Sequence, residues 1–231
     1  MITLNENTNS VPLDSQAQSH GLSKVHGQAY PYWRELIRNG DWLLWRPTSW
    51  AGKLICRFTE QEYSHVSMAA WVLHDDDTEH LYNVEMIQFR GGRRTRLSKE
   101  IAQYPGMCDV YRPKDQYIDQ KDGTKKRARY NGKNAAYQML FLMSRPYGWL
   151  DFFYLAARIL LGMTFPERQK DSNDPDVPRV CSAAVSYAAR VGGGIDVTAA
   201  FPDALTTPGM FANPEVARYI TTLYPEEVEA A

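Results

Sequence analysis

The residue best suited to covalent chemistry is a cysteine at the start of a predicted helix. Small and apolar residues recur at helical spacing over 180–191, and the three glycines at 192–194 supply a stop. Pro178 cannot continue a helix, so the helix is expected to begin near Val180, with Cys181 in its first turn. Unpaired backbone N–H groups and the helix dipole favour a thiolate there. The alternative is a small, buried packing residue.

A thiolate nucleophile needs a base, and the base needs an orienting group. Residues 63–73 and 81–89 are predicted to form an antiparallel hairpin. His65 lies on the first strand among apolar residues, and Glu85 interrupts an apolar run on the second, where a carboxylate needs a partner. We therefore predict that Cys181 is the nucleophile, His65 the base and Glu85 its orienting acid. The alternative for His65 is a hydrogen-bonded histidine of the core. The alternative for Glu85 is an acid on the solvent face of an edge strand.

The pairing of this hairpin decides whether the base and the acid can meet. A symmetric hairpin about Asp77 would offset His65 and Glu85 by several residues, which is too far for contact at a rise of roughly 3.3 Å per residue. Direct pairing would then require an asymmetric turn or a bulge. Gln88 is the alternative orienting residue if the register differs.

The rest of the chain predicts a mixed α and β domain. Strands are expected at 42–46 and 107–112, a basic turn at 91–96, a solvated charged loop at 113–129 and an exposed loop at 164–179. The predicted helices are 31–39, 50–58, 97–104 with Ser98 as its cap, 130–143, 150–161 and 214–223.

Length and composition indicate one globular domain. Of the 231 residues, 29–223 are assigned to that domain, 1–28 to a flexible polar arm and 224–231 to an acidic tail. The net charge of -1 gives no reason to expect nucleic acid as a partner. Three widely spaced cysteines make neither a disulfide framework nor a zinc site, and no cofactor or metal is predicted. Neither a signal peptide nor a transmembrane segment is recognised, which predicts a cytoplasmic protein or one delivered by a phage particle or secretion system.

The order of these parts resembles a known family, the circularly permuted papain-like cysteine amidases and peptidases of the YiiX type. These are related to NlpC-type cell-wall peptidases and to lecithin retinol acyltransferase. The resemblance spans residues 40 to about 212. It rests on Gly40-Asp41, Tyr63-Ser64-His65-Val66, Asn83-Val84-Glu85, Tyr147-Gly148-Trp149, Val180-Cys181-Ser182 and Thr207-Pro208-Gly209.

This resemblance implies an α+β fold in which an antiparallel sheet packs against helices. It implies a Cys181–His65–Glu85 triad that cleaves an amide in a peptide, cell-wall or lipid-like substrate through a thioester. The backbone N–H of Cys181 would help to form the oxyanion hole, with Tyr63 and Ser182 as further oxyanion or substrate residues. Ser67 replaces the usual glycine, Ala183 replaces a frequent acid, and the His-to-acid interval is long. These departures leave the third triad member and the substrate open.

Other function classes remain. The acidic run 74–80 could bind a divalent cation, although a solvated turn also has this composition. The basic segments 90–96 and 125–129 could contact phosphates, although solvated loops are equally basic. On the implied fold, a lipid acyl hydrolase or acyltransferase and a catalytically silent binding module are the alternatives to an amidase.

Overall fold

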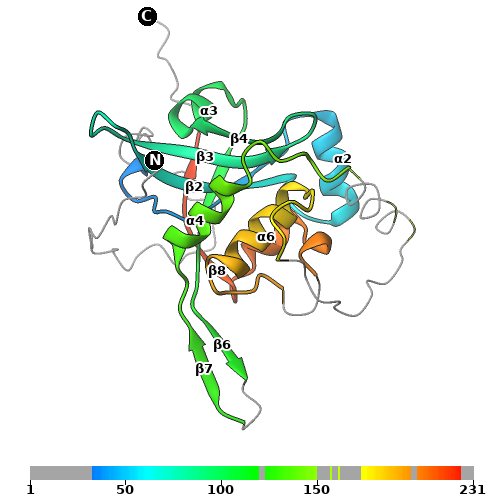
Figure 1. Ribbon diagram of the computed structural model, residues 1–231. Coiled ribbons are helices and arrows are strands. Elements are labelled where there is room, and N and C mark those ends of the chain that lie inside the picture. The colour runs from blue at the N-terminus through cyan, green and yellow to red at the C-terminus, as the bar shows by residue number, and fades with distance from the viewer. Residues whose placement is uncertain are drawn as a thin grey trace, which may run out of the picture.

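A six-stranded antiparallel sheet forms the centre of the molecule. The computed structural model describes residues 33–119, 123–149, 157, 161, 173–198 and 202–224. The sheet has the strand order β4-β3-β2-β1-β5-β8, and a separate two-stranded hairpin, β6–β7, extends away from the body (Figure 1). The strands are β1 (Trp42–Trp45), β2 (His65–Leu73), β3 (Glu79–Ile87), β4 (Gly91–Arg96), β5 (Cys108–Pro113), β6 (Gln116–Asp119), β7 (Lys125–Ala128) and β8 (Ala217–Leu223).

Helices cover both faces of this sheet. Two longer helices, α4 (Gly132–Phe141) and α6 (Cys181–Val191), lie on one face, and α3 (Leu97–Gln103) lies on the other (Figure 1). The remaining described helices are α2 (Trp50–Thr59) and the short turns η1 (Asp203–Leu205) and η2 (Pro208–Ala212). The chain therefore forms the mixed α and β architecture with an antiparallel sheet that its sequence predicts.

The central strands are buried on both sides, which explains their nearly continuous apolar sequences. On β2, Val66, Met68 and Ala70 belong to the hydrophobic cluster shared with α4 and α6. The alternate residues Ala69 and Trp71 belong to the cluster shared with α3. Because successive side chains of a strand point to opposite faces, one strand contributes to both clusters. This places His65 at the end of a strand that is fixed from both sides.

Three predicted elements are wrong. Residues 91–96 form the strand β4 rather than a turn, because their backbone pairs along β3 while basic side chains remain at the sheet edge. The predicted loop 113–129 contains the hairpin β6–β7. The predicted helix 214–223 is instead the strand β8, in which Ala217, Thr221 and Leu223 are buried. In each case the pairing partner is distant in the sequence or the side chains are polar. The local pattern of apolar residues therefore did not predict these strands.

Other expectations have mixed outcomes. The helices predicted at 50–58, 97–104 and 130–143 are confirmed as α2, α3 and α4. Ser98 does not cap α3, because that helix begins at Leu97 and its N-cap residue makes no side-chain hydrogen bond. The arm at 1–28, most of the helix at 150–161 and nearly all of the acidic tail lie outside the described residues.

The connection between β3 and β4 holds an aromatic residue in an unusual backbone conformation. Phe89 has φ of 66° and is 87% exposed, and its ring centroid lies 4.9 Å from that of Trp149. A bulky residue is strained at this φ, whereas glycine is not. We therefore expect Phe89→Gly to be more stable than Phe89→Ala by about 1 kcal/mol, since both remove the ring and only glycine relieves the strain. Denaturant unfolding of the two variants measures this difference, and equal stability would contradict it.

Candidate active site

Cys181 lies at the start of α6, as the sequence predicted. Val180 is the N-cap residue with extended backbone, and Cys181 is the first residue of the helix. The helix is buried along nearly its whole length, so its first turn is held firmly against the sheet. Cys181 itself is partly exposed, whereas Cys108 is buried. A partly exposed cysteine that is held in position is suited to react with a substrate.

His65 and Glu85 are hydrogen-bonded to each other. The distance from His65 Nε2 to Glu85 Oε2 is 2.6 Å. Ala69 pairs with Asn83, and continuing this register places Glu85 opposite Ser67, on the same face as His65. The two residues are therefore diagonal neighbours across β2 and β3, which long side chains can bridge.

The expectation that a simple hairpin would separate His65 from Glu85 is wrong. Leu73 pairs with Glu79, so the turn is centred on Asp76 and not on Asp77. This shift reduces the offset between base and acid to two residues. No bulge is needed in β2 or β3.

The electrostatics favour an ion pair between the thiol and the imidazole. Burial lowers the pKa of His65, but the charge and hydrogen bond of Cys181 and the contact with Glu85 outweigh it and raise the pKa to about 10. Burial raises the pKa of the Cys181 thiol, but His65 and the backbone N–H groups of Val66 and Ser182 bring it below its ordinary value. The favoured state of the pair near neutral pH is thus a thiolate beside an imidazolium.

Glu85 is itself held by an arginine that sequence reasoning missed. Arg93 pairs with Glu85 across β3 and β4, and its Nε donates to Glu85 Oε1 at 2.8 Å. Arg93 also contacts Glu100 on α3 at 3.2 Å. Burial opposes the charge on Glu85, yet His65 and Arg93 together hold the pKa of Glu85 below its ordinary value. The alternation of side chains along 91–96 was the available signal, but it is informative only once that segment is known to be a strand.

A pocket of about 200 Å³ borders this group of residues. Its polar lining includes His65, Glu85 and Arg93, and its remaining walls are largely aromatic and aliphatic. The full lining is Trp45, His65, Glu85, Ile87, Arg93, Glu100 and Tyr104. The pocket offers an apolar surface beside the imidazole that is paired with Cys181.

The hydroxyls of the two predicted oxyanion residues are engaged elsewhere. Tyr63 donates to Asp109 Oδ2 at 2.7 Å, and Ser182 donates to the carbonyl oxygen of Thr206 at 2.6 Å. Ser182 instead directs its backbone N–H to the Cys181 sulfur. The structure therefore brings Cys181, His65 and Glu85 together but gives the side chains of Tyr63 and Ser182 structural contacts.

Tyr147 is an additional polar residue near the sulfur. It is almost fully buried, and burial followed by the charge of Cys181 raises the pKa of its hydroxyl. Gln88 forms a hydrogen bond with Tyr147. Gln88, the alternative orienting residue, thus contacts Tyr147 while Glu85 contacts His65. The hydroxyl of Tyr147 therefore stays neutral under the influence of the Cys181 charge.

The acidic turn between β2 and β3 makes its contacts locally. Asp76 accepts hydrogen bonds from Thr78, and His74 is hydrogen-bonded to the hydroxyl of Tyr82. Within the described residues, no group of three or more His, Cys, Asp or Glu side chains could hold a metal ion. Among these same residues, no helix is both long and apolar enough for a bilayer crossing.

Comparison with known proteins supports the fold. No protein-family model matches the chain, and no curated protein matches it significantly. The solved structure of metalloprotein yiiX from Escherichia coli O157:H7 is similar, with a TM-score of 0.51 and 15% sequence identity. The match covers 82% of this chain and 99% of that one. The chain therefore has a YiiX-like α+β fold, and at this level of identity the likeness extends to the fold alone.

Proposed function

We propose that the protein is a thiol hydrolase that cleaves an amide bond through a thioester intermediate. The observation that carries this proposal is the 2.6 Å contact between His65 and Glu85, with His65 also hydrogen-bonded to Cys181 at the start of α6. A nucleophile, a base and a group that orients the base are the parts that such chemistry requires.

The contacts give each residue a defined part in the reaction. His65 Nε2 contacts Glu85, which leaves Nδ1 for Cys181. The thiolate attacks the amide carbonyl carbon, and the oxyanion accepts a hydrogen bond from the backbone N–H of Cys181. The His65 imidazolium then protonates the leaving amine as the C–N bond breaks, which leaves a thioester. Water attacks the thioester while His65 takes its proton, and release of the carboxylic acid restores the thiolate and the imidazolium.

The order of these residues also supports a permuted papain-like arrangement. In this chain the base on β2 and the acid on β3 precede the nucleophile on α6. In the proposed fold the sheet supplies His65 and Glu85, and a helix packed on its face presents Cys181. A circular permutation preserves such packing while it changes the chain order.

The similar yiiX structure is titled a metalloprotein, which raises the question of a metal in this chain. The described residues do not fit one, since they contain no cluster of three or more His, Cys, Asp or Glu side chains. The sulfur and imidazole of the proposed site are committed to each other as an ion pair. The proposed mechanism has no step through a metal.

A second candidate is an ester-linked acyl substrate on the same residues. The observation that favours it is the lining of the pocket beside His65, where Trp45, Ile87 and Tyr104 supply apolar walls. An acyl chain would bury its surface against these side chains. The chemistry at Cys181 would be unchanged, with an alcohol as the leaving group.

Trapping of the acyl-enzyme tests the proposal. The protein is incubated with panels of activated amides and esters, quenched in acid and analysed by mass spectrometry of its peptides. We expect the acyl mass on Cys181, and neither acylation nor turnover above background in Cys181→Ala. Cys56→Ala is the matched control and is expected to retain both, because Cys56 is a partly exposed cysteine of α2 whose thiol pKa burial raises. Turnover that persists in Cys181→Ala would contradict the proposal.

A further inference from the structure

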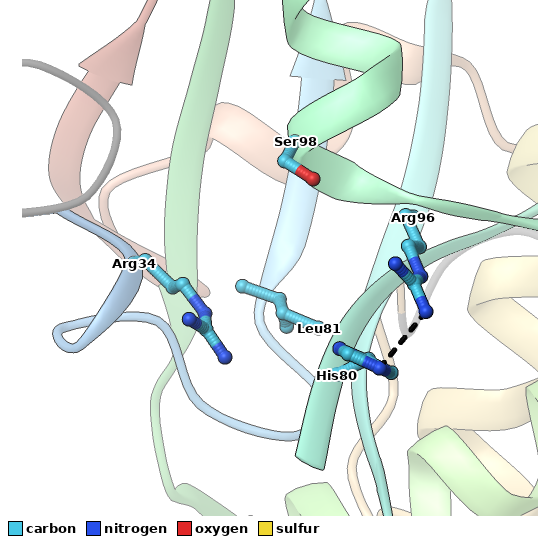
Figure 2. A pocket seen from close by; sticks show the side chains of 5 residues that line it. All are labelled: Arg34, His80, Leu81, Arg96 and Ser98. Atoms are coloured by element: carbon cyan, nitrogen blue, oxygen red, sulfur yellow. Dashed lines mark hydrogen bonds between the residues drawn. The ribbon is translucent and has the colours of Figure 1, made fainter. Parts of the chain in front are cut away.

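A second pocket lies at the opposite end of the β2–β3 hairpin from His65. It has a volume of about 100 Å³ and is lined by Arg34, His80, Leu81, Arg96 and Ser98 (Figure 2). His80 pairs with Val72, near the end of the strand that His65 begins. At a rise of roughly 3.3 Å per residue, the two sites are about 23 Å apart along β2. The second pocket is therefore separate from the proposed active site.

Two guanidinium groups of this pocket are held in place by neutral contacts. Arg34 donates from Nη2 to the carbonyl oxygen of Glu79 at 3.2 Å, and its guanidinium carbon lies 4.8 Å from the ring centroid of Trp71. Arg96 Nη2 lies 2.9 Å from His80 Nε2. Figure 2 shows the two guanidinium groups on either side of Leu81 and His80. Each arginine keeps further N–H donors beyond these contacts.

Neither arginine is neutralised by a carboxylate in the part of the chain that the structure describes. The acids of the adjoining hairpin turn are Asp75, Asp76, Asp77 and Glu79, and none of them forms an ion pair with Arg34 or Arg96 among the described residues. Two guanidinium groups thus line one small pocket without an ion-paired carboxylate among the described residues, and Asp76 is an acid whose charge reaches His80. Such an arrangement is unfavourable by itself and becomes favourable when an anion binds.

The other two polar groups of the pocket complete a set of donors. Arginine only donates, so its contact makes His80 Nε2 an acceptor and leaves the proton on Nδ1. Burial and the charge of Arg96 lower the pKa of His80, which is consistent with this neutral form. Ser98 adds a hydroxyl at the margin of the pocket (Figure 2). Arginine and serine donors that line one small pocket suit a tetrahedral oxyanion.

We propose that the pocket formed by Arg34, His80, Arg96 and Ser98 binds a phosphate monoester group. Its two negative charges match the two guanidinium groups, and its several oxygens can accept from both arginines at once. The group could belong to a small phosphorylated molecule or to the head group of a lipid. This site does not depend on the proposed hydrolase activity, since none of its residues lies in the pocket beside His65.

Titration calorimetry with a soluble phosphate monoester, glycerol 3-phosphate, tests the proposal on the full chain. Binding to phosphatidic acid vesicles, with phosphatidylserine vesicles as the control for charge alone, tests the lipid source. The variants are Arg34→Gln and Arg96→Gln. Arg218→Gln is the matched control, because Arg218 is an exposed arginine on β8, at the other edge of the sheet.

We expect saturable binding of glycerol 3-phosphate or a preference for phosphatidic acid over phosphatidylserine. Each pocket variant should weaken that binding about tenfold or more, and Arg218→Gln should leave it unchanged. The ligand that binds identifies the source of the phosphate. Binding of neither ligand, equal binding to both kinds of vesicle, or affinities that Arg34→Gln and Arg96→Gln leave unchanged would overturn the proposal. Thermal unfolding of each variant shows whether it is folded. A pocket variant that does not fold is replaced by Ser98→Ala, which should also weaken binding of the phosphate ligand about tenfold.

Discussion

His65→Ala is expected to slow alkylation of Cys181 by iodoacetamide at least about tenfold at pH 5.5. Without the imidazolium, the thiol returns to an ordinary pKa of about 8.5 or above, since burial alone raises it. An ordinary thiol is only about 0.1% thiolate at pH 5.5. A more basic thiolate is a better nucleophile, which restores part of the lost rate and makes tenfold a conservative expectation.

The pH profile of this variant separates the effect from a general change in access. In His65→Ala the midpoint of the alkylation rate should move upward to about 8.5 or beyond, while the rate at high pH remains substantial. His74→Ala is the matched control, because His74 directly follows the far end of β2 and contacts Tyr82. It should leave the profile of Cys181 unchanged. An unaltered midpoint in His65→Ala would show that His65 does not stabilise the thiolate.

Asp109→Ala is expected to have the largest effect on stability, with a loss of about 3 kcal/mol. Asp109 is fully buried and accepts hydrogen bonds from Arg46 at 2.9 Å, from Tyr63 at 2.7 Å and from Thr222. Its removal takes the buried carboxylate partner away from the partly buried guanidinium of Arg46 and from the hydroxyl of Tyr63. For a domain of this size, such a loss lowers the melting temperature by about 6 to 12 °C.

Thermal and denaturant unfolding measure this effect against a control that shares the same arginine. Glu62 lies 3.8 Å from Arg46 with a side chain that is 73% exposed, so Glu62→Ala should change the unfolding free energy by less than about 1 kcal/mol. Asp109→Asn keeps the shape of the side chain and one oxygen acceptor. Its loss of unfolding free energy should therefore lie between those of Asp109→Ala and Glu62→Ala. Equal losses for Asp109→Ala and Glu62→Ala would contradict the role of Asp109 as the shared acceptor of Arg46, Tyr63 and Thr222.

The parts of the site that sequence predicted best are those encoded locally. Pro178 and the small residues after Val180 define the start of α6, and that start positions Cys181. His65 and Glu85 were recognisable because each is a polar group inside an apolar strand. Local chemistry therefore identified the three candidates before any contact between them was known.

The parts that sequence missed depend on pairing between distant or polar segments. Arg93 was assigned to a turn, because a basic edge strand has no apolar alternation to reveal it. The strand β8 pairs with β5 far away in the sequence, and a register shift at Val110 interrupts that pairing. The contact between His65 and Glu85 depended on a turn centre displaced by one residue, which composition does not determine.

The contact made by Tyr63 also depends on a partner that is distant in the sequence. The family resemblance implied that Tyr63 donates to the oxyanion, but its hydroxyl donates to Asp109 on β5. The partner that Tyr63 finds lies 46 residues away in the sequence, so local pattern does not determine what its hydroxyl contacts. Tyr147, which lies near Cys181, comes from a segment whose function sequence indicated only through family resemblance.

The measurement that most directly tests the thiolate–imidazolium pair is the rate of alkylation of each cysteine in the unmodified protein from about pH 5 to about pH 9. We predict that Cys181 reacts with a midpoint well below about 8.5, while Cys56 follows a higher midpoint and buried Cys108 remains inert, because burial raises the pKa of both Cys56 and Cys108. A Cys181 that titrates together with Cys56, or that does not react, would contradict the proposed nucleophile and leave the chain a binding module on a YiiX-like fold.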